Sequence, residues 1–218
     1  MQIIMEKENE VFLRLSCEPG VGMELNHYFR FHPKDYQFMP MFRRKKWDGY
    51  VYLYNMNSGR IYYGLKNKIQ RFASDREYEL IDRTNDPTQP LSNEDYLKFL
   101  TSFPCEFKLR DYQSLAVRHS IDKKRCVLLS PTASGKSFVI YYLIRYYFPQ
   151  KTLIIVPTLS LVSQMYSDFE AYAKVDKTFK VEKFVHKIFG GQEKTTDKPI
   201  IISTWQSLYE LEKNFFTD

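Results

Sequence analysis

The carboxy-terminal half of the chain alternates short apolar runs with longer amphipathic segments. The apolar runs lie at 126–130, 152–157 and 200–204. Runs of this length without charged residues are typical of strands buried on both faces of a parallel sheet. The segments between them, 135–147 and 158–173, place apolar residues at helical period. This order predicts an α/β fold in which right-handed crossovers join the strands of a mostly parallel sheet.

The amino-terminal half has shorter predicted elements than the carboxy-terminal half, and their order predicts a small α+β unit. Its predicted elements are a strand at 10–18, a helix at 19–31, a hairpin with strands at 47–55 and 60–64, and a helix at 65–78. Alternation of apolar and polar residues indicates the first strand, and Asn, Ser and Gly at 55–59 indicate the hairpin turn. In the last helix Leu65, Ile69, Phe72 and Ala73 form one apolar stripe.

A polar stretch with two prolines, residues 83–93, separates the two halves and is expected to be a linker. Ser92 then precedes a short amphipathic segment whose first turn is acidic, which favours Ser92 as a helix N-cap. We therefore expect a small basic nucleic-acid-binding domain at 1–90. A second domain is expected at 91–218, incomplete at its carboxy terminus.

Positive charge is concentrated in one segment of this 218-residue chain, whose formal net charge is +6. Residues 28–72 contain ten Lys or Arg and only two acids, Asp35 and Asp48. A local basic field of this kind attracts polyanions, and nucleic acid is the expected partner. The cations expected to contact phosphates are Arg43, Arg44, Lys45 and Lys46 in one loop, and Lys66, Lys68 and Arg71 in a second row.

Three scattered cysteines and four histidines, without metal-ligand spacing, argue against a disulfide framework and a zinc site. They favour a reducing cytoplasm, which is the host cytoplasm if a phage encodes the chain. The apolar runs are far shorter than the ~20 residues of a membrane helix, and the amino terminus does not resemble a signal peptide.

The segment SPTASGKS, residues 130–137, lies between the first apolar run and the following amphipathic segment. This is the setting of a phosphate-binding P-loop, in which backbone N–H groups and a helix N-terminus cradle the β-phosphate of a nucleotide. Lys136 is expected to reach the β- and γ-phosphates, and Ser137 to bind Mg. The first position is Ser130 where the usual pattern has Gly. The alternative is a chance Gly-Lys-Ser with a solvated lysine, and the flanking elements disfavour it.

Four segments together resemble superfamily 2 helicases in order and spacing. PTASGKS resembles motif I, and FKLRDYQSLAV at 107–117 resembles the Q-type motif. TLIIVPTLSLVSQM at 152–165 and IIISTWQSL at 200–208 resemble motifs whose ends contact the nucleic-acid backbone. The resemblance implies a RecA-like fold, ATP and Mg as cofactors, and Lys136 and Ser137 as catalytic residues. It implies nucleotide contacts by Arg110, Gln113 (to adenine), Thr132, Ala133, Ser134 and Gly135, and nucleic-acid contacts by Pro157, Thr158, Gln164, Thr204 and Gln206.

The basic amino-terminal half resembles the small domain that precedes the helicase core in UvsW-type recombination helicases of T-even-like phages. The resemblance implies ATP-dependent remodelling of branched DNA: junction branch migration and the dissociation of D-loops and R-loops, the latter containing an RNA–DNA hybrid. Another superfamily 2 activity, such as an RNA helicase or a restriction motor subunit, stays open as an alternative. A non-catalytic nucleotide- and DNA-binding protein is the alternative from a different class.

Superfamily 2 hydrolysis needs an acidic motif that begins with Asp-Glu, and this sequence contains no Asp-Glu pair. The second RecA-like domain of the family also has no counterpart in these 218 residues. We therefore expect that this chain alone lacks ATP turnover.

Two tryptophans have two interpretations each. Trp47, directly after the basic loop, either stacks on a base or anchors the following strand in the core. Trp205 either stacks on a base or packs at a strand-to-helix junction. The core interpretation is favoured for both.

Overall fold

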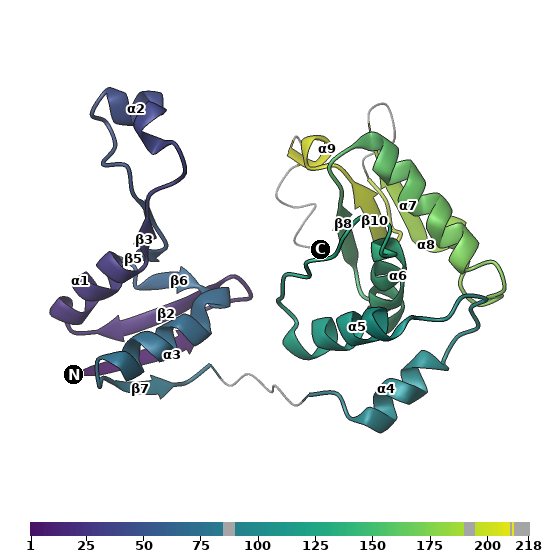
Figure 1. Cartoon of the computed structure of the whole chain (residues 1–218), viewed down its shortest axis with the longest axis horizontal. Helices are drawn as coiled ribbons and strands as arrows, with labels where there is room; N and C mark the ends of the chain where they lie inside the picture. The colour runs from purple at the N-terminus through teal and green to yellow at the C-terminus, as the bar shows by residue number, and fades with distance from the viewer. Residues whose placement is uncertain (85–89, 190–194, 210, 212–218) are drawn as a thin grey trace. The chain divides into compact units, whose positions relative to one another are not determined.

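The computed structural model describes residues 1–84, 90–189, 195–209 and 211. Contacts between Cα atoms divide the chain into two compact units, Met1–Pro87 and Thr88–Asp218. The division falls within the stretch expected to be a linker, of which 85–89 lie outside the described residues. Figure 1 labels helices and strands of both units.

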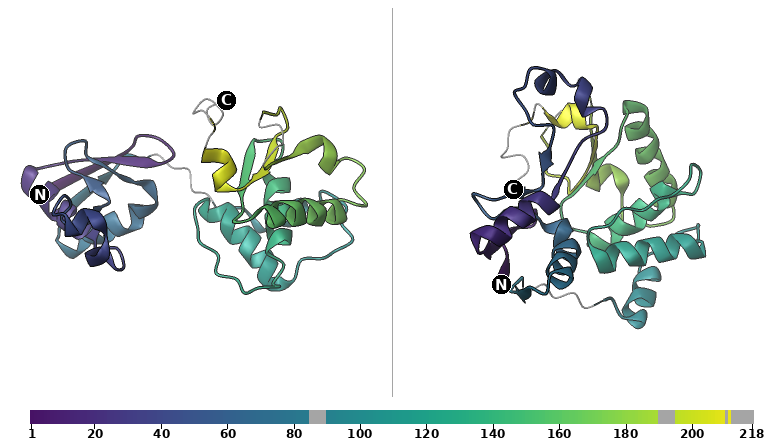
Figure 2. Two further views of the ribbon diagram at one scale, coloured as in Figure 1. Left: turned by 90° about the horizontal axis from the view of Figure 1, so that it is seen from above. Right: turned by 60° about the vertical axis from the view of Figure 1, so that its left-hand side comes forward.

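The first unit is built on a five-stranded sheet in the order β5-β6-β2-β1-β7. The strands are β1 (Gln2–Lys7), β2 (Phe12–Cys17), β5 (Tyr54–Asn55), β6 (Arg60–Tyr62) and β7 (Glu79–Asp82). β1 runs antiparallel to β2 and parallel to β7. Helices α1 (Pro19–Tyr28) and α3 (Lys66–Asp75) lie against the same face of this sheet (Figure 2).

The core of the first unit lies between the sheet and its two helices. Ile3 and Leu13 point inward from the strands, and Leu25 and Phe72 meet them from the helices. Alternate strand residues therefore face the helices, as the apolar spacing of 10–18 predicted, and the apolar stripe of α3 is buried as expected. The structure adds β1 and β7, which the sequence patterns did not indicate.

An arm formed by residues 29–53 leaves the sheet between α1 and β5. Its base is a two-stranded ladder in which β3 (Arg30–Phe31) pairs with β4 (Val51–Tyr52). Its tip contains the 3₁₀ turn η1 (Tyr36–Phe38) and the short helix α2 (Pro40–Arg43), which lie away from the sheet (Figure 1). The predicted hairpin strand at 47–55 is therefore divided, because Val51 and Tyr52 pair within the arm whereas Tyr54 and Asn55 pair with β6.

The second unit is a three-stranded parallel sheet in the order β8-β10-β9, surrounded by helices. The strands are β8 (Thr152–Ile155), β9 (Val185–Ile188) and β10 (Ile200–Ser203). The helices are α4 (Asn93–Leu100), α5 (Asp111–Lys123), α6 (Lys136–Tyr147), α7 (Leu159–Tyr172), α8 (Val181–Phe184) and α9 (Trp205–Tyr209). Ser92 caps α4 as predicted, since its hydroxyl accepts a hydrogen bond from the Asp95 N–H at 3.0 Å.

The predicted first strand of this sheet, at 126–130, is wrong. The segment forms neither strand nor helix, and no described strand pairs with it. Its side chains are open to solvent: Val127 is 85% and Leu129 95% exposed. An apolar run becomes a buried strand only where a neighbour takes up its backbone hydrogen bonds, and the described part of the chain provides none here. β8 likewise buries only one face, because Leu153 and Ile155 are exposed.

Candidate nucleotide and nucleic-acid sites

Gln113 joins the start of α5 to the loop that precedes α6. Its Oε1 accepts a hydrogen bond from the Arg110 N–H at 2.9 Å, and its Nε2 donates to the Ser134 carbonyl oxygen at 2.9 Å. The hydroxyl of Tyr112 donates to the same carbonyl at 3.1 Å. Two side chains of α5 thus hold the 130–135 loop at Ser134. The buried Gln113 amide keeps one N–H and one lone pair beyond these bonds, enough for the expected adenine contact.

The turn into α6 requires glycine at position 135. Gly135 has a φ of 77°, and a Cβ there would lie 2.4 Å from Nε2 of Gln113. Ala133, two residues earlier, also has a positive φ of 63°. A left-handed conformation in a non-glycine residue is strained, and such strain is concentrated at ligand-binding sites. The loop is therefore held in a shape that its own local preferences do not favour.

Lys136 and Ser137 open α6, as the motif predicted. The Lys136 ammonium donates to the carbonyl oxygen of Pro131 at 2.7 Å and less closely to that of Ser130 at 3.4 Å. The Ser137 hydroxyl lies 3.0 Å from the hydroxyl of Tyr172. Burial raises the pKa of Tyr172, so this phenol stays protonated at neutral pH and can donate to Ser137. The Lys136 side chain therefore folds back onto the 130–135 loop. An anion bound at this loop would compete with the two carbonyl oxygens for the ammonium group.

A cavity of about 850 Å³ lies beside this loop. Arg110, Tyr112, Gln113, Lys136 and residues 127–134 are part of its lining. The first N–H groups of a helix have no intrahelical partner, and with the helix dipole they form an anion site. Size, anion site, lysine and buried amide fit a nucleotide, and the expected contacts Thr132, Ala133 and Ser134 lie on its wall. The apolar part of the lining comes from the exposed side chains of 127–129 and from Ala116, Val139, Ile140 and Leu143.

The carboxyl ends of β8 and β10 meet at one edge of the parallel sheet. Ile155 pairs with Ser203, so Pro157 and Thr158 follow one strand where Thr204 and Gln206 follow its neighbour. Thr158 caps α7, since its Oγ1 accepts from the Leu161 N–H at 3.4 Å. Pro157, Thr158, Gln164 and Gln206 are exposed and open to a nucleic acid.

Thr204 does not have the placement expected of a nucleic-acid contact. It is 3% exposed, and its hydroxyl lies 3.0 Å from the Ser207 hydroxyl, at the start of α9. Its hydroxyl serves the backbone turn, which residue type alone did not reveal.

The four consecutive cations of the arm, Arg43 to Lys46, are all exposed. None of the four forms an ion pair with a described carboxylate. Charges without a protein partner remain available to phosphates.

The three cations of the second row, Lys66, Lys68 and Arg71, differ in their ion pairing and exposure. Lys66 forms an ion pair with Asp82 at 2.9 Å and contacts Thr84, so its charge is neutralised within the unit. Lys68 is exposed, and Arg71 lies 3.7 Å from Asp75 on the same helix. The expectation of a DNA contact at Lys66 is therefore not supported by its placement, whereas Lys68 and Arg71 stay accessible.

The core interpretation of the tryptophans fails for Trp205 and holds only in part for Trp47. Trp205 is 57% exposed on α9. Trp47 is half-buried within the arm and lies outside the core between sheet and helices. Its indole Nε1–H donates to the Tyr50 carbonyl oxygen at 2.8 Å.

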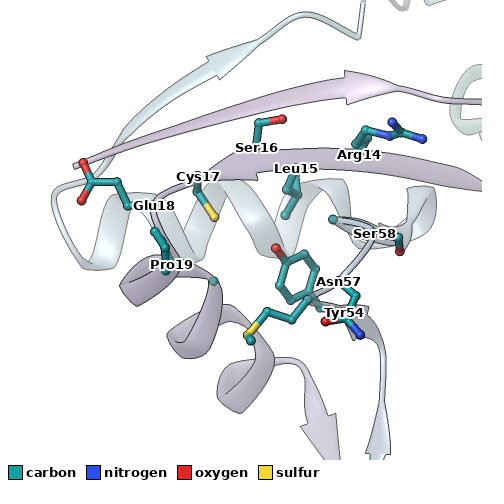
Figure 3. Close-up of a pocket in the computed structure, with 12 residues that line it drawn as sticks. Arg14, Leu15, Ser16, Cys17, Glu18, Pro19, Tyr54, Asn57 and Ser58 are labelled. Carbon is teal, nitrogen blue, oxygen red and sulfur yellow. The ribbon is translucent and has the colours of Figure 1, made fainter.

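A further cavity in the first unit, of about 450 Å³, lies between β2, the start of α1 and the turn after β5. Figure 3 shows Leu15 and Cys17 pointing toward Tyr54, whereas Arg14 and Ser16 point to the other face of the strand. Burial chiefly raises the pKa of the Cys17 thiol, and burial together with the thiol raises that of Tyr54 to about 12. Both groups stay protonated at neutral pH.

Metal-binding clusters and membrane-spanning helices are both absent from the described ranges. No cluster of three or more His, Cys, Asp or Glu there could hold a metal ion. Among the helices described, none is long and apolar enough to cross a membrane. Ser137, at the phosphate loop, is the residue expected from the sequence to bind Mg, with further oxygen ligands from a nucleotide phosphate.

The sequence did not predict two partners of the phosphate loop. Tyr112 lies within the matched motif, but its hydrogen bond to Ser134 spans 22 residues. Tyr172 lies 35 residues from Ser137, at the end of α7. The motif could have pointed to Tyr112, whereas Tyr172 carries no local signal, because its contact with Ser137 arises only when helices pack.

Comparison with known families identifies both units. Residues 106–217 match the family described as type III restriction enzyme, res subunit. Residues 4–82 match the family described as DNA helicase UvsW, N-terminal.

The chain is also similar to individual proteins. It is 32% identical to the ATP-dependent DNA helicase uvsW of Enterobacteria phage T4, with 94% of this chain and 42% of that protein covered. It is 32% identical over 104 residues to the DNA 3'-5' translocase XPB2 of Sulfurisphaera tokodaii, with 48% of this chain and 21% of that protein covered. The chain thus spans less than half the length of these curated relatives.

Solved structures match over the whole chain. A crystal structure of the UvsW helicase from Bacteriophage T4 superposes with a TM-score of 0.84 at 30% identity, covering 100% of this chain and 79% of that chain. A second crystal structure of T4 UvsW gives a TM-score of 0.85 at 30% identity and 45% coverage of that chain. Because both units match and one solved relative is covered over most of its length, this chain belongs to the UvsW family of helicases, as its amino-terminal region.

Proposed function

We propose that this chain is the ATP-binding and DNA-binding amino-terminal portion of a helicase that remodels branched DNA. The observation that carries the proposal is the phosphate loop. Gln113 and Tyr112 hold its Ser134 carbonyl, Gly135 makes its turn, and Lys136 stands at the head of α6. The relatives named above as DNA helicase and DNA translocase support the choice of DNA as partner.

Each residue of the loop has a defined task in nucleotide binding. The N-terminus of α6 and the Lys136 ammonium bind the phosphates, and Ser137 offers its hydroxyl to Mg. ATP supplies the phosphoanhydride bond whose hydrolysis drives a helicase. Gln113 holds the loop and lines the cavity, where its adenine contact is proposed.

DNA is proposed to bind the exposed cations of the arm and the exposed ends of the motifs after β8 and β10. Phosphate contacts carry little sequence information, so binding should tolerate any sequence. Junctions, D-loops and the RNA–DNA hybrid of an R-loop are the substrates we infer from the family. The cytoplasm, or the host cytoplasm for a phage protein, is the proposed location.

Lys136→Ala tests the nucleotide half of the proposal. The variant should bind a fluorescent ATP analogue at least ~10-fold more weakly, because it loses a charge-assisted contact to phosphate. Its thermal unfolding should not change, since Lys136 is exposed. Lys174→Ala, which removes an exposed charge elsewhere in the same unit, should keep full affinity. Equal ATP affinity of Lys136→Ala and the unchanged chain would refute the site.

Replacement of Arg43, Arg44, Lys45 and Lys46 together by Ala tests the DNA half. Affinity for a branched DNA should fall well over ~10-fold at about 50 mM salt, and each lost contact should lower the salt slope by roughly 0.9. A matched control removes the same charge from the second unit by changing Lys174, Lys177, Lys180 and Lys183 to Ala; all four are exposed. If both quadruple variants lose the same affinity, only net charge matters and the arm is not the contact.

A further inference from the structure

The arm carries a small aromatic cluster of its own, distant from the main core. The rings of Tyr36 and Tyr50 lie 4.0 and 3.8 Å from that of His32, centre to centre. The Arg30 guanidinium lies 4.1 Å from the centre of the Tyr50 ring. Gly49 has a φ of 85°, and a Cβ there would lie 2.7 Å from the Tyr36 ring. These contacts give the tip of the arm a defined shape despite its distance from the sheet.

A cavity of about 570 Å³, the arm cavity, opens at this tip. Its lining residues are Gln37, Phe42, Arg43, Lys45, Lys46, Trp47 and Asp48. Its volume falls in the range of small-molecule sites. The lining thus combines two aromatic rings, three cations, one side-chain amide and one carboxylate.

Trp47 and Asp48 in the arm cavity have hydrogen-bond partners within the protein, whereas the three cations have no described carboxylate partner. The indole N–H of Trp47, its only hydrogen-bond donor, binds the Tyr50 carbonyl oxygen and fixes the ring. No unsatisfied polar group of Trp47 then faces the cavity. Asp48 is occupied as well, because its carboxylate accepts from the Tyr50 N–H at 3.0 Å and from the Tyr52 hydroxyl. Those hydrogen bonds, the one from Tyr52 first, hold the pKa of Asp48 below its usual value. Arg43, Lys45 and Lys46 have no described carboxylate partner, as shown above.

We propose that the arm cavity holds one unpaired nucleotide of a DNA strand, with its base against Trp47 and Phe42 and its phosphate at the three cations. The proposal rests on the proposed function and names the feature of branched DNA that the arm recognises. A paired base shows no face to a side chain outside the stack, whereas an unpaired base stacks on aromatic rings regardless of its identity. Phosphate binding alone would need the cations but not a fixed indole beside them.

The exposed apolar side chains next to the cavity agree with this occupant. Phe38 is 67% and Met41 54% exposed at the tip. Apolar side chains of this kind insert between base steps in other DNA complexes. An anionic membrane surface is disfavoured, because α2 has four residues and cannot form the long amphipathic face that interfacial binding uses.

Tryptophan fluorescence tests the proposal directly, because the chain contains two tryptophans. In full-length Trp205→Phe, Trp47 is the sole reporter. We expect single-stranded oligothymidine, and a duplex with one central unpaired thymidine, to quench its emission on binding. The blunt duplex of the same length should bind through phosphates without quenching. Equal quenching by all three DNAs, or none, would overturn the proposal. Quenching or blue shift with phosphatidylserine vesicles alone would overturn it in favour of a membrane.

A second measurement compares affinities. Trp47→Leu should weaken binding of the duplex with the unpaired thymidine by about 5- to 150-fold, the range of one lost base–aromatic stack. Its affinity for the blunt duplex should stay within about twofold of the unchanged chain, which also shows that the arm remains folded. Trp47→Phe should recover most of the loss. If Trp47→Leu lowers both affinities equally, the indole is structural and the inference fails, whereas the ATP and quadruple-variant tests still decide the proposed function.

Discussion

At the scale of single residues, the position of the Gln113 side chain depends on the absence of a side chain at Gly135. The Gln113 amide reaches the Ser134 carbonyl only because position 135 has no side chain in its way. The left-handed φ of Gly135 would also strain any other residue. The loop geometry therefore depends on one glycine and one buried amide together.

Gly135→Ala should consequently damage the loop more than the fold. We expect the unfolding free energy to fall by about 1–3 kcal/mol, and ATP affinity to fall at least ~10-fold because the loop moves off Gln113. The measurements are urea unfolding and titration with a fluorescent ATP analogue. Gly20→Ala is the matched control, because an added Cβ meets no atom within 4 Å there. Unchanged ATP affinity in Gly135→Ala would contradict this account of the loop.

The sequence predicts this site in part, for a physical reason. Gly135, Lys136 and Ser137 are consecutive, so the chemistry that needs them is visible as a local pattern. Tyr172 is not predictable in that way, because it meets Ser137 only through the packing of α6 on α7. Local chemistry is visible in a sequence, whereas side chains recruited by tertiary packing are not.

At the scale of elements, an ion pair links α6 to the turn after α7. The Arg145 guanidinium donates to the Asp176 carboxylate at 2.6 Å, and the side chains are 10% and 0% exposed. Phe103 and Phe179 lie 4.3 and 4.4 Å from the guanidinium. Asp176 also accepts from the Thr178 N–H at 2.8 Å. A charge removed from water this completely depends on its partner.

Asp176 should make the stability of the second unit depend on acid pH. Burial acts to raise the pKa of Asp176, but hydrogen bonds from Thr178 and Arg145 outweigh it and hold the pKa below its usual value. A folded pKa below the unfolded value of about 3.9 gives stability that is complete above that value. The unfolding free energy should therefore fall as pH is lowered from about 5 through the folded pKa.

Asp176→Asn keeps the shape and removes the charge. We expect a loss of about 3–5 kcal/mol at pH 7, since Arg145 is left buried without a counter-charge, and a flatter dependence on pH below 5. Urea unfolding followed by circular dichroism across a pH series measures both. Asp197→Asn, at an exposed carboxylate, should change neither. An unaltered acid slope in Asp176→Asn would show that other carboxylates cause it.

The elements differ in how far their pattern determines them. α3 and α4 were predictable because an apolar stripe or a Ser cap is a property of the element itself. The segment 126–130 has an apolar pattern as strong as that of β10, yet it forms no strand in the described structure. Pairing is a property of two segments, so one apolar run does not determine it. The division between β4 and β5 also depends on pairing, because Val51 pairs with Phe31 within the arm whereas Tyr54 pairs with Ile61 of β6.

At the scale of the whole molecule, the two units divide the chemistry between them. The first unit carries the arm with its exposed cations, and the second carries the phosphate loop. Each has its own hydrophobic core, formed by residues within that unit. The hydrophobic pattern changes from the short strands and helices of the first unit to the alternating apolar runs and amphipathic segments of the second. This change made the division predictable, because each unit's pattern follows from its own core.

The two units should therefore fold and bind separately. We expect residues 1–87 and residues 88–218, expressed alone, each to unfold in one cooperative urea transition. The first fragment should bind a duplex carrying an unpaired thymidine and keep the part of the salt slope that the arm cations contribute, because those cations lie within it. The second should bind the ATP analogue with the affinity of the whole chain, because Gln113 and Lys136 both lie within it. Limited proteolysis of the intact chain should correspondingly cut within 83–91 before it cuts between β8 and β10. Preferred cleavage between those strands, or a first fragment that fails to fold, would show that each core needs the other unit.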